Sequence, residues 1–244
     1  MHFVLLYGLS NLGIKYVITF SHQSKMSERN SSFLQFMPVG VPKVPFLIPK
    51  AKEASWVDVY NRLYRQRFLF LGQEIDRVIS NQLVGLIVFL NIENNKKDIF
   101  LYINCPGGWI LPGFGLVGTM QTVQPDVNTI CLGVAVSIGS FILLGGTTTK
   151  RLAFEHAKIM MYQPFSSFFK LAPIDGRLEL KLLRDAHQKI VRAYVRKTGQ
   201  TPWAVSRDLK KPFFMTPEEA QKYGIVDAIA DFTPHPIRMI LTKK

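Results

Sequence analysis

Cysteine is scarce in this sequence: only Cys105 and Cys131 occur among 244 residues, and no CxxC pair is present. A disulfide scaffold needs more cysteines than this, and a zinc site built from cysteines needs closely spaced pairs. Both classes of protein are therefore excluded. So few thiols are typical of a protein from a reducing compartment.

Long apolar runs are also missing. No stretch of about 18 uninterrupted apolar residues occurs, so a helix that spans a membrane is not expected. The apolar opening, residues 1–20, is broken by polar residues such as Lys15, and it lacks the charged start of a secretory signal. Residues 1–36 loosely resemble a transit peptide, but we favour a disordered extension ahead of a start at Met37.

Acidic residues are few: 17 Asp and Glu face 30 Lys and Arg, which leaves a net charge of +13. Such an excess can mark a nucleic-acid surface. The cations are scattered, however, with no run of five and no interleaved aromatics and glycines of an RNA-binding signature. The sequence therefore predicts a generally basic surface and no nucleic-acid partner, although steep salt dependence in a gel shift would favour the alternative.

Apolar residues make up 48% of the chain, enough for a substantial core, and their periodicity predicts alternating strands and helices. The expected strands are 67–72, 98–104, 128–136, 157–164 and 225–230. The expected helices are 77–90, a segment up to about residue 123, 137–144, 173–197 and 216–224. Strands separated by helices predict an α/β fold with parallel pairing.

The most specific local signal lies in residues 216–224. Thr216 fits an N-cap, Pro217 fits the first turn, Glu219 completes a capping box, and Gly224 fits the end of the helix. A short helix is predicted here from local chemistry alone.

Residues 37–50 hold four prolines among apolar residues. Proline fixes φ and removes a hydrogen-bond donor, so this segment is predicted to be an extended arm, not a helix or a central strand. Immediately afterwards, Trp56, Val59 and Leu63 recur at helical spacing, which predicts a helix.

One serine stands out in the segment Gly-Val-Ala-Val-Ser-Ile-Gly-Ser-Phe, residues 133–141. Serine hydrolysis needs a hydroxyl, a base with an orienting group, and backbone N–H donors for the oxyanion. Ser137 sits at a predicted strand–helix junction, and Gly107 and Gly108 offer unobstructed amides after another strand. Small residues at such a junction more often serve packing than catalysis, so the pattern alone does not decide.

From Met37 to about Asp231 the chain resembles the ClpP family of serine peptidases, most closely its plastid version. The matching segments include MPVGVPKVPF, LYINCPGGW, TMQTVQPDVNTIC, VSIGSFILLGG, IMMYQP and FMTPEEAQKYGIVD. The resemblance implies a crotonase-like ClpP fold, a spiral of βαβ units with a protruding handle helix. It also implies stacked seven-membered rings of ClpP-family subunits, an AAA+ unfoldase that delivers unfolded proteins, and a location in the plastid stroma.

The resemblance places the family's nucleophile on Ser137 and its oxyanion donors on the backbone amides of Gly108 and Ile138. Tyr162 occupies the position of the family's histidine, and Pro212 that of its aspartate. A phenol, with an ordinary pKa of about 10, cannot readily accept the serine proton at neutral pH. Proline has no side-chain acceptor at all.

Three nearby residues could substitute for the missing groups. Asp208 lies four residues before the acid position and matches a family acid outside the triad. His156 lies six residues before Tyr162, about 20 Å away along an extended strand, and His187 lies on the expected handle helix. We expect none of the three to rescue catalysis.

The sequence therefore predicts a catalytically impaired subunit of the ATP-dependent Clp protease core, with no metal or cofactor of its own because the partner unfoldase uses the ATP. The predicted parts are an extension (1–36), an axial pore arm (37–50), a peptidase domain (51–232) and a basic tail (233–244). The alternatives are an active endopeptidase with an atypical base and, from the same fold, a crotonase-type acyl-CoA enzyme. Cys105, where the family more usually has serine, is interpreted as a small buried residue.

Overall fold

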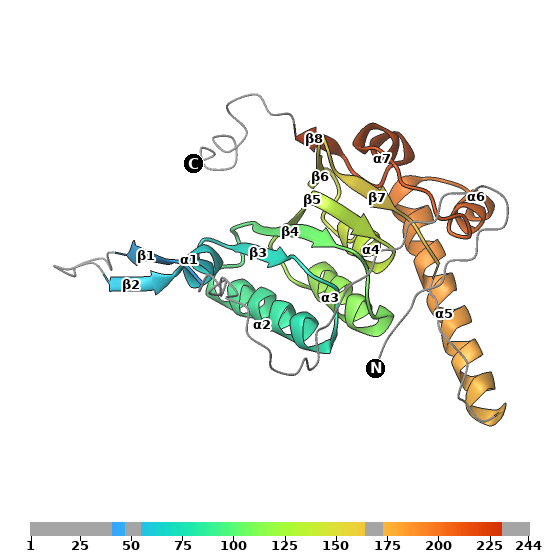
Figure 1. The fold of residues 1–244 in the computed structure, drawn as a ribbon, viewed down its shortest axis with the longest axis horizontal. Coiled ribbons are helices and arrows are strands. Elements are labelled where there is room, and N and C mark those ends of the chain that lie inside the picture. Colours follow the sequence, from blue (N-terminus) through green and yellow to red (C-terminus); the bar gives the residue numbers. More distant parts are fainter. Residues whose placement is uncertain (1–40, 47–54, 164–172, 231–244) are drawn as a thin grey trace, which may run out of the picture. The chain divides into compact units, whose positions relative to one another are not determined.

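A parallel β-sheet organises the residues that the computed structural model describes, 41–46, 55–163 and 173–230. Its strand order is β3-β4-β5-β6-β8, and β7 pairs with β5 beside that path (Figure 1). The strands are β3 (Phe68–Leu71), β4 (Ile99–Cys105), β5 (Val127–Val136), β6 (Arg151–Phe154), β7 (Lys158–Met160) and β8 (Ala228–Ala230). All pairs in this sheet are parallel, as the alternation of strands and helices predicts.

The helices connect and cover these strands. They are α1 (Val59–Arg65), α2 (Arg77–Glu93), α3 (Ile110–Thr122), α4 (Ile138–Leu144), α5 (Pro173–Thr198), α6 (Pro202–Asp208) and α7 (Pro217–Tyr223). In α2, Leu83, Ile87 and Leu90 recur on one face and are buried. α2 packs on α3 and α3 packs on α4, so the three helices and the strands enclose the apolar core (Figure 1).

Strand β5 changes its pairing partner along one of its edges. Its first half pairs with β6 through Thr129, Ile130 and Cys131. Its last three residues leave β6 and pair with β7 instead, with Val136 opposite Met160. On its other edge β5 pairs with β4, whose register shifts at Cys105. The end of β5 therefore meets two segments that lie far apart in the sequence.

The fold class and most of the expected elements are confirmed, and three details differ. Trp56 lies in strand β2 (Ser55–Asp58), not in a helix, because β2 pairs in antiparallel register with β1 (Lys43–Phe46). The expected strand 157–164 is shorter, and β6 and α6 carried no recognised signal, being four and seven residues long. The extended form of the arm is confirmed for β1, while residues 37–40 and 47–50 lie outside the described residues.

The capping box of α7 is present as predicted. The Thr216 hydroxyl accepts a hydrogen bond from the Glu219 N–H, and the Glu219 carboxylate accepts one from the Thr216 N–H at 2.8 Å. Gly224 ends the helix with a φ of +95°. A left-handed residue at this place is common because it satisfies the last carbonyl groups of the helix.

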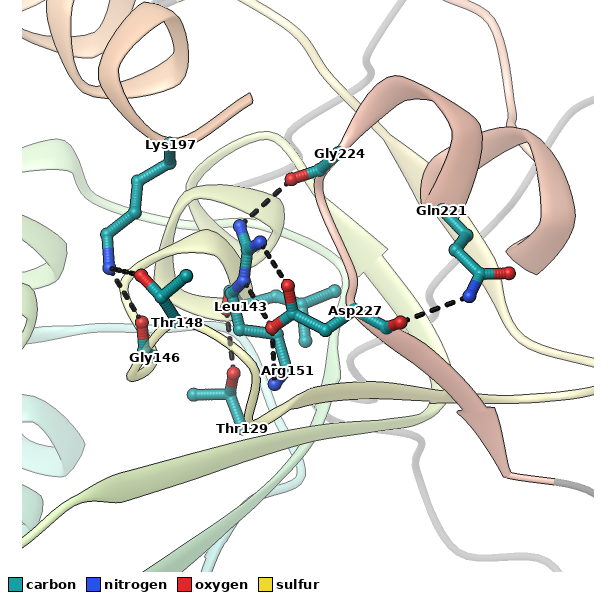
Figure 2. Close-up of polar contacts among 9 residues, drawn as sticks. All are labelled: Thr129, Leu143, Gly146, Thr148, Arg151, Lys197, Gln221, Gly224 and Asp227. Atoms are coloured by element: carbon teal, nitrogen blue, oxygen red, sulfur yellow. Dashed lines mark hydrogen bonds and ion pairs between the residues drawn. The ribbon is translucent and has the colours of Figure 1, made fainter. Parts of the chain in front are cut away.

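One ion pair fastens β6 to the chain that follows α7 (Figure 2). Arg151, only 3% exposed, donates from Nε and Nη2 to the Asp227 carboxylate at 2.8 and 2.5 Å. Its Nη1 also donates to the Gly224 carbonyl at 2.9 Å, and its own backbone N–H donates to the Asp227 carboxylate at 3.0 Å. A bidentate pair in which all three guanidinium nitrogens donate hydrogen bonds can offset the cost of burying the charge.

The pKa of Asp227 is lowered from its ordinary value of 3.8. Burial alone would raise this pKa, but the hydrogen bonds from Arg151 and its positive charge outweigh burial. A carboxylate with a lowered folded-state pKa stabilises the fold fully above the unfolded value. That stabilisation is lost as the pH falls through the lowered pKa.

We expect Asp227→Asn to reduce the free energy of unfolding by about 3 kcal/mol at pH 7, because it leaves the Arg151 charge buried without a counter-ion. The difference from the native chain should begin to narrow near pH 3.8, where the carboxyl is protonated in the unfolded chain, and should be lost as the pH falls through the lowered pKa of the folded state. Urea unfolding from pH 7 to pH 3 measures both effects.

Asp126→Asn is the matched control for that experiment. Asp126 also accepts from a lysine, Lys150, at 2.8 Å, but its side chain is 48% exposed. Asp126→Asn should reduce the free energy of unfolding by less than about 1 kcal/mol. If both variants lost the same free energy of unfolding, the burial of Arg151 would not explain the destabilisation by Asp227→Asn.

Candidate functional site

Ser137 stands at the turn between β5 and α4. It is the N-cap residue of α4, and its backbone adopts φ 52° and ψ −111°. Its N–H donates to the Met160 carbonyl at 2.8 Å, which ties the turn to β7. A non-glycine residue with a positive φ costs on the order of 1–3 kcal/mol and persists only where its surroundings enforce it. The turn therefore presents a half-buried hydroxyl on a strained backbone.

The hydroxyl of Ser137 has no hydrogen-bond partner within the described residues, and it does not cap α4. A serine at an N-cap ordinarily accepts a bond from the first turn of its helix. Here that capping bond is absent within the described residues. Its position at a helix start also favours a negative charge on the oxygen.

The loop after β4 presents two glycines with φ of +131° (Gly107) and +135° (Gly108). Ile75 holds the loop in place: its N–H donates to the Gly107 carbonyl, and its carbonyl accepts from the Trp109 N–H, both at 2.9 Å. The N–H of Gly108 has no acceptor in the described part of the chain, and neither has the N–H of Ile138. Two unused amides near a strained serine are what an oxyanion site requires.

Cys105 packs directly beneath this arrangement. It is fully buried, and its thiol donates to the Gly107 carbonyl at 3.1 Å. A Cβ on Gly139 in α4 would lie 2.9 Å from the Cys105 carbonyl oxygen, so the helix and the strand are in close contact here. Burial raises the pKa of Cys105. Its interpretation as a small buried residue is confirmed, and it supports the loop by packing.

Tyr162 follows β7 by two residues and is half-buried. Because Met160 is paired with Val136, the chain after β7 runs beside the turn that carries Ser137. The next residue, Gln163, donates its N–H to the Leu209 carbonyl at 2.9 Å. The backbone thus brings the position of Tyr162 to the end of β5, next to the serine.

Pro212 lies exposed in the loop between α6 and α7. Both ends of that loop are fastened to the β7 region. Leu209 accepts from Gln163, and Met215 exchanges two backbone hydrogen bonds with Ile159, at 2.7 and 3.1 Å. The fold therefore gathers three segments distant in sequence, those of Ser137, Tyr162 and Pro212, but it gathers no imidazole and no carboxylate at these positions.

The three residues considered as substitutes for the missing base and acid have other hydrogen-bond partners or lie in other parts of the fold. Asp208 accepts from the Tyr223 hydroxyl at 3.1 Å and from Arg207 at 2.9 Å. His156 is exposed and precedes β7. His187 lies on α5, where burial, and secondarily the charge of Lys210, lowers its pKa. A neutral imidazole is able to accept a proton, but within the described residues no hydrogen bond joins either histidine to Ser137.

The described residues contain no group of three or more His, Cys, Asp and Glu side chains arranged to hold a metal ion. Among the helices of the same residues, none combines the length and the apolar character needed to cross a bilayer.

Ile75 and Met160 were missed by sequence reasoning, although their backbones position the site. Both are apolar residues inside apolar runs, and their contribution comes from main-chain groups that every residue carries. No side-chain signal could have found them, because only the pairing of strands decides which carbonyl faces Ser137 and which faces Trp109.

Comparison with known proteins adds independent information. The family model described as Clp protease matches residues 51–233. A protein of Eucalyptus globulus subsp. globulus named "ATP-dependent Clp protease proteolytic subunit" is 57% identical over 194 residues, which cover 80% of this chain and 99% of that protein. Proteins with the same name from Lotus japonicus and Nicotiana tabacum are 56% identical over the same shares.

The two loop glycines make a matched pair for mutagenesis. A Cβ atom on Gly108 would overlap the carbonyl oxygen of Ile75 and would lie 2.6 Å from the backbone nitrogen of Ile75. A Cβ atom on Gly107 would lie 3.8 Å from its nearest neighbour, the Val136 carbonyl oxygen. Both substitutions to alanine carry the strain of a positive φ, on the order of 1–3 kcal/mol. We expect Gly108→Ala to cost about 2 kcal/mol more than Gly107→Ala in urea unfolding.

The difference in free energy of unfolding between the two variants measures the effect of the contact with Ile75. If Gly107→Ala proved as damaging as Gly108→Ala, close packing of the loop against Ile75 would not explain the requirement for glycine.

Proposed function

The chain belongs to the Clp protease family, and we propose that it is a subunit of the ATP-dependent Clp protease core that contributes to the architecture of the particle while its own site is catalytically impaired. The observation that carries the proposal is the identity of the groups around Ser137. Tyr162 and Pro212 reach this region of the fold through the backbone pairings of β7 and of the α6–α7 loop.

The chemistry of acyl transfer explains the impairment. The serine oxygen must lose its proton as it attacks, so a base has to accept that proton in the transition state. A phenol is already protonated at neutral pH, and proline cannot orient any base. Loss of the base alone lowers the turnover of a triad by several orders of magnitude, and further losses add little because the members act together.

The rest of the fold is intact and supports a role in assembly. Large apolar side chains are exposed along the helices that cover the sheet, including Val78 (64%), Phe89 (60%), Ile92 (77%) and Leu111 (73%). Exposed apolar surface on this scale is typical of a protein–protein interface. It supports the packing of this chain against other subunits of the family in stacked seven-membered rings.

Within such a particle the chain would form part of the chamber wall, with unfolded proteins delivered by an AAA+ unfoldase that consumes the ATP. Relatives named as Clp proteolytic subunits come from plants, which supports a plastid location, and we place the particle in the stroma. Peptide hydrolysis would then come from other subunits of the same core.

Restoring the missing groups tests the proposal. We expect Tyr162→His together with Pro212→Asp to increase the rate at which a fluorophosphonate probe labels Ser137 by at least about a hundredfold, because the base and its orienting group return. The native chain and the double variant are compared within purified cores, and mass spectrometry identifies the labelled peptide. Adding Ser137→Ala to the double variant should remove the label.

A native chain that labels as fast as the double variant would contradict the proposal and favour an active peptidase with an atypical base.

The second test removes the hydroxyl from the otherwise native chain. Ser137→Ala should leave the casein-degrading activity of the whole core unchanged within error, because other subunits supply the turnover. The same change in a subunit with a complete triad is the matched control and should reduce that activity. A clear loss with Ser137→Ala in this chain would show that its serine is catalytic.

A further inference from the structure

Three parallel strands carry the residues of the candidate site at their carboxyl ends. β4, β5 and β7 pair in parallel, so these ends lie at the same edge of the sheet (Figure 1). Gly108 follows β4, Ser137 follows β5 and Tyr162 follows β7. Ligands of open α/β sheets bind outside this edge. The fold thus provides a place for a ligand whether or not the chain hydrolyses it.

Four hydrogen-bond donors at this edge have no acceptor within the described residues. They are the N–H groups of Gly108 and Ile138 and the hydroxyls of Ser137 and Tyr162. Polar groups without a protein partner bind water or a ligand. A ligand that fits four donors has to supply acceptors, and an anion supplies the strongest ones.

The backbone brings these donors to one place. A Cβ atom on Gly107 would lie 3.8 Å from the Val136 carbonyl oxygen, so the loop after β4 approaches the residue that precedes Ser137. The Ser137 N–H donates to the Met160 carbonyl at 2.8 Å, which brings the chain after β7 to the same turn. Donors from three strand ends therefore meet at this turn.

A cation lies beside the Gly108 amide. The Trp109 N–H donates to the Ile75 carbonyl at 2.9 Å, and the Arg77 guanidinium lies over the Trp109 ring, 5.1 Å from the ring centroid. The side chains of Arg77 and Trp109 are both exposed. Arg77 forms no salt bridge in the described part of the chain, so its charge is not neutralised by a neighbouring carboxylate.

The other charged residues at this edge leave it net positive. Glu74 and Asp76 precede Arg77 in the loop before α2, where the Asp76 carboxylate caps the helix. Lys210 and Lys211 are exposed on the α6–α7 loop, which backbone hydrogen bonds fasten to the β7 region. Three cations thus stand against two acids, and this balance favours a negatively charged ligand over a neutral one.

The position of the family's acid adds no negative charge. Residue 212 is proline, and Asp208, four residues earlier, accepts hydrogen bonds from Tyr223 and Arg207 at 3.1 and 2.9 Å. A carboxylate at position 212 would repel a second carboxylate bound nearby. Its replacement therefore removes a repulsion that would weaken the binding of an anion.

We propose that the site around Ser137 binds the C-terminal carboxylate of a peptide and does not hydrolyse that peptide. One carboxylate oxygen would accept from the amides of Gly108 and Ile138, and the other from the hydroxyls of Ser137 and Tyr162. Hydrogen bonds to a charged acceptor are about twice as strong as those to a neutral carbonyl. Donors placed for a transient oxyanion therefore bind a permanent carboxylate more tightly than an uncleaved peptide bond.

The source of this ligand rests on the proposed function. Hydrolysis of a peptide bond in a subunit with a complete triad gives one product with a new carboxylate and one with a new amine. The carboxylate product is released inside the same core. The chain would then hold cleaved peptides by their C-terminal ends, a binding role that needs no turnover.

Two peptides that differ only at the C-terminus test the proposal. A short uncharged peptide of alanine, serine and leucine, labelled with fluorescein at its N-terminus, is prepared with a free carboxylate and with a carboxamide. Fluorescence anisotropy with the full-length chain measures both dissociation constants. We expect the carboxylate to bind at least about tenfold more tightly, because charge-assisted hydrogen bonds replace neutral ones.

Removing the two hydroxyls tests the location of the bound carboxylate. Ser137→Ala with Tyr162→Phe deletes one oxygen from each side chain and should weaken binding of the carboxylate by on the order of tenfold. Binding of the carboxamide should weaken much less, because a neutral end group gains less from these donors. Far-ultraviolet circular dichroism checks that the variant remains folded.

Removing the cation tests the contribution of charge. We expect Arg77→Gln to weaken binding of the carboxylate by about threefold and to leave the carboxamide unchanged. Lys96→Gln is the matched control, because it removes the same charge from an exposed residue outside the site. An equal effect of the two substitutions would show that net charge, not Arg77, attracts the peptide.

Three results would overturn the proposal. Equal affinities for the carboxylate and the carboxamide would show that the donors do not recognise the charged end. Unchanged binding of the carboxylate by the Ser137→Ala, Tyr162→Phe chain would place the peptide elsewhere. Displacement of the peptide by acetate at the peptide's own concentration would assign the site to small free anions.

Catalytic impairment and carboxylate binding are measured separately. If a fluorophosphonate labelled native Ser137 as fast as the Tyr162→His, Pro212→Asp variant while the carboxylate was still preferred, impairment would be wrong and the binding site would stand. Slow labelling with equal affinities for the two peptides would leave impairment standing and would remove the binding site.

Discussion

The fold depends on a single constraint at β5, a ten-residue strand that has to pair with three others. β4 occupies one of its edges along most of its length, while β6 and β7 divide the other edge between them. Buried backbone N–H and C=O groups need partners, so the change from β6 to β7 determines where the last residues of β5 lie. Ser137 immediately follows this point, and its N–H is held by the β7 residue Met160.

This constraint explains how the backbone around Ser137 is held in place. The strained backbone of Ser137 and the positive-φ glycines of the loop after β4 are enforced by strand pairing and by Ile75. None of these contacts involves the side chains of residues 162 or 212. The side chains at these two positions can therefore change while the turn, the loop and the surrounding core remain.

The cations of the fold fall into two groups, buried and exposed. Inside the fold, cations join elements that are distant in sequence: Arg151 connects β6 to the segment after α7, and Arg67 donates to the carbonyls of Leu90, Asn94 and Lys97 at the end of α2. Each of these guanidinium groups is almost fully buried and donates at least three hydrogen bonds. The exposed cations of α5 at positions 181, 184, 189, 192 and 196 form no salt bridge within the described residues.

The sequence by itself determined what depends on local chemistry and on residue identity. Four features could be predicted from the sequence alone. They are the capping box at Thr216, the parallel α/β class, the matching family segments, and the absence of histidine at position 162 and of aspartate at position 212. Only the tertiary structure decided that Trp56 lies in a strand, that Met160 and Ile75 hold the site, and that five cations of α5 share an exposed face. Capping involves residues within four positions of one another, whereas strand pairing and burial join residues tens of positions apart. The free energy that selects those distant pairs comes from the whole core and leaves no local pattern.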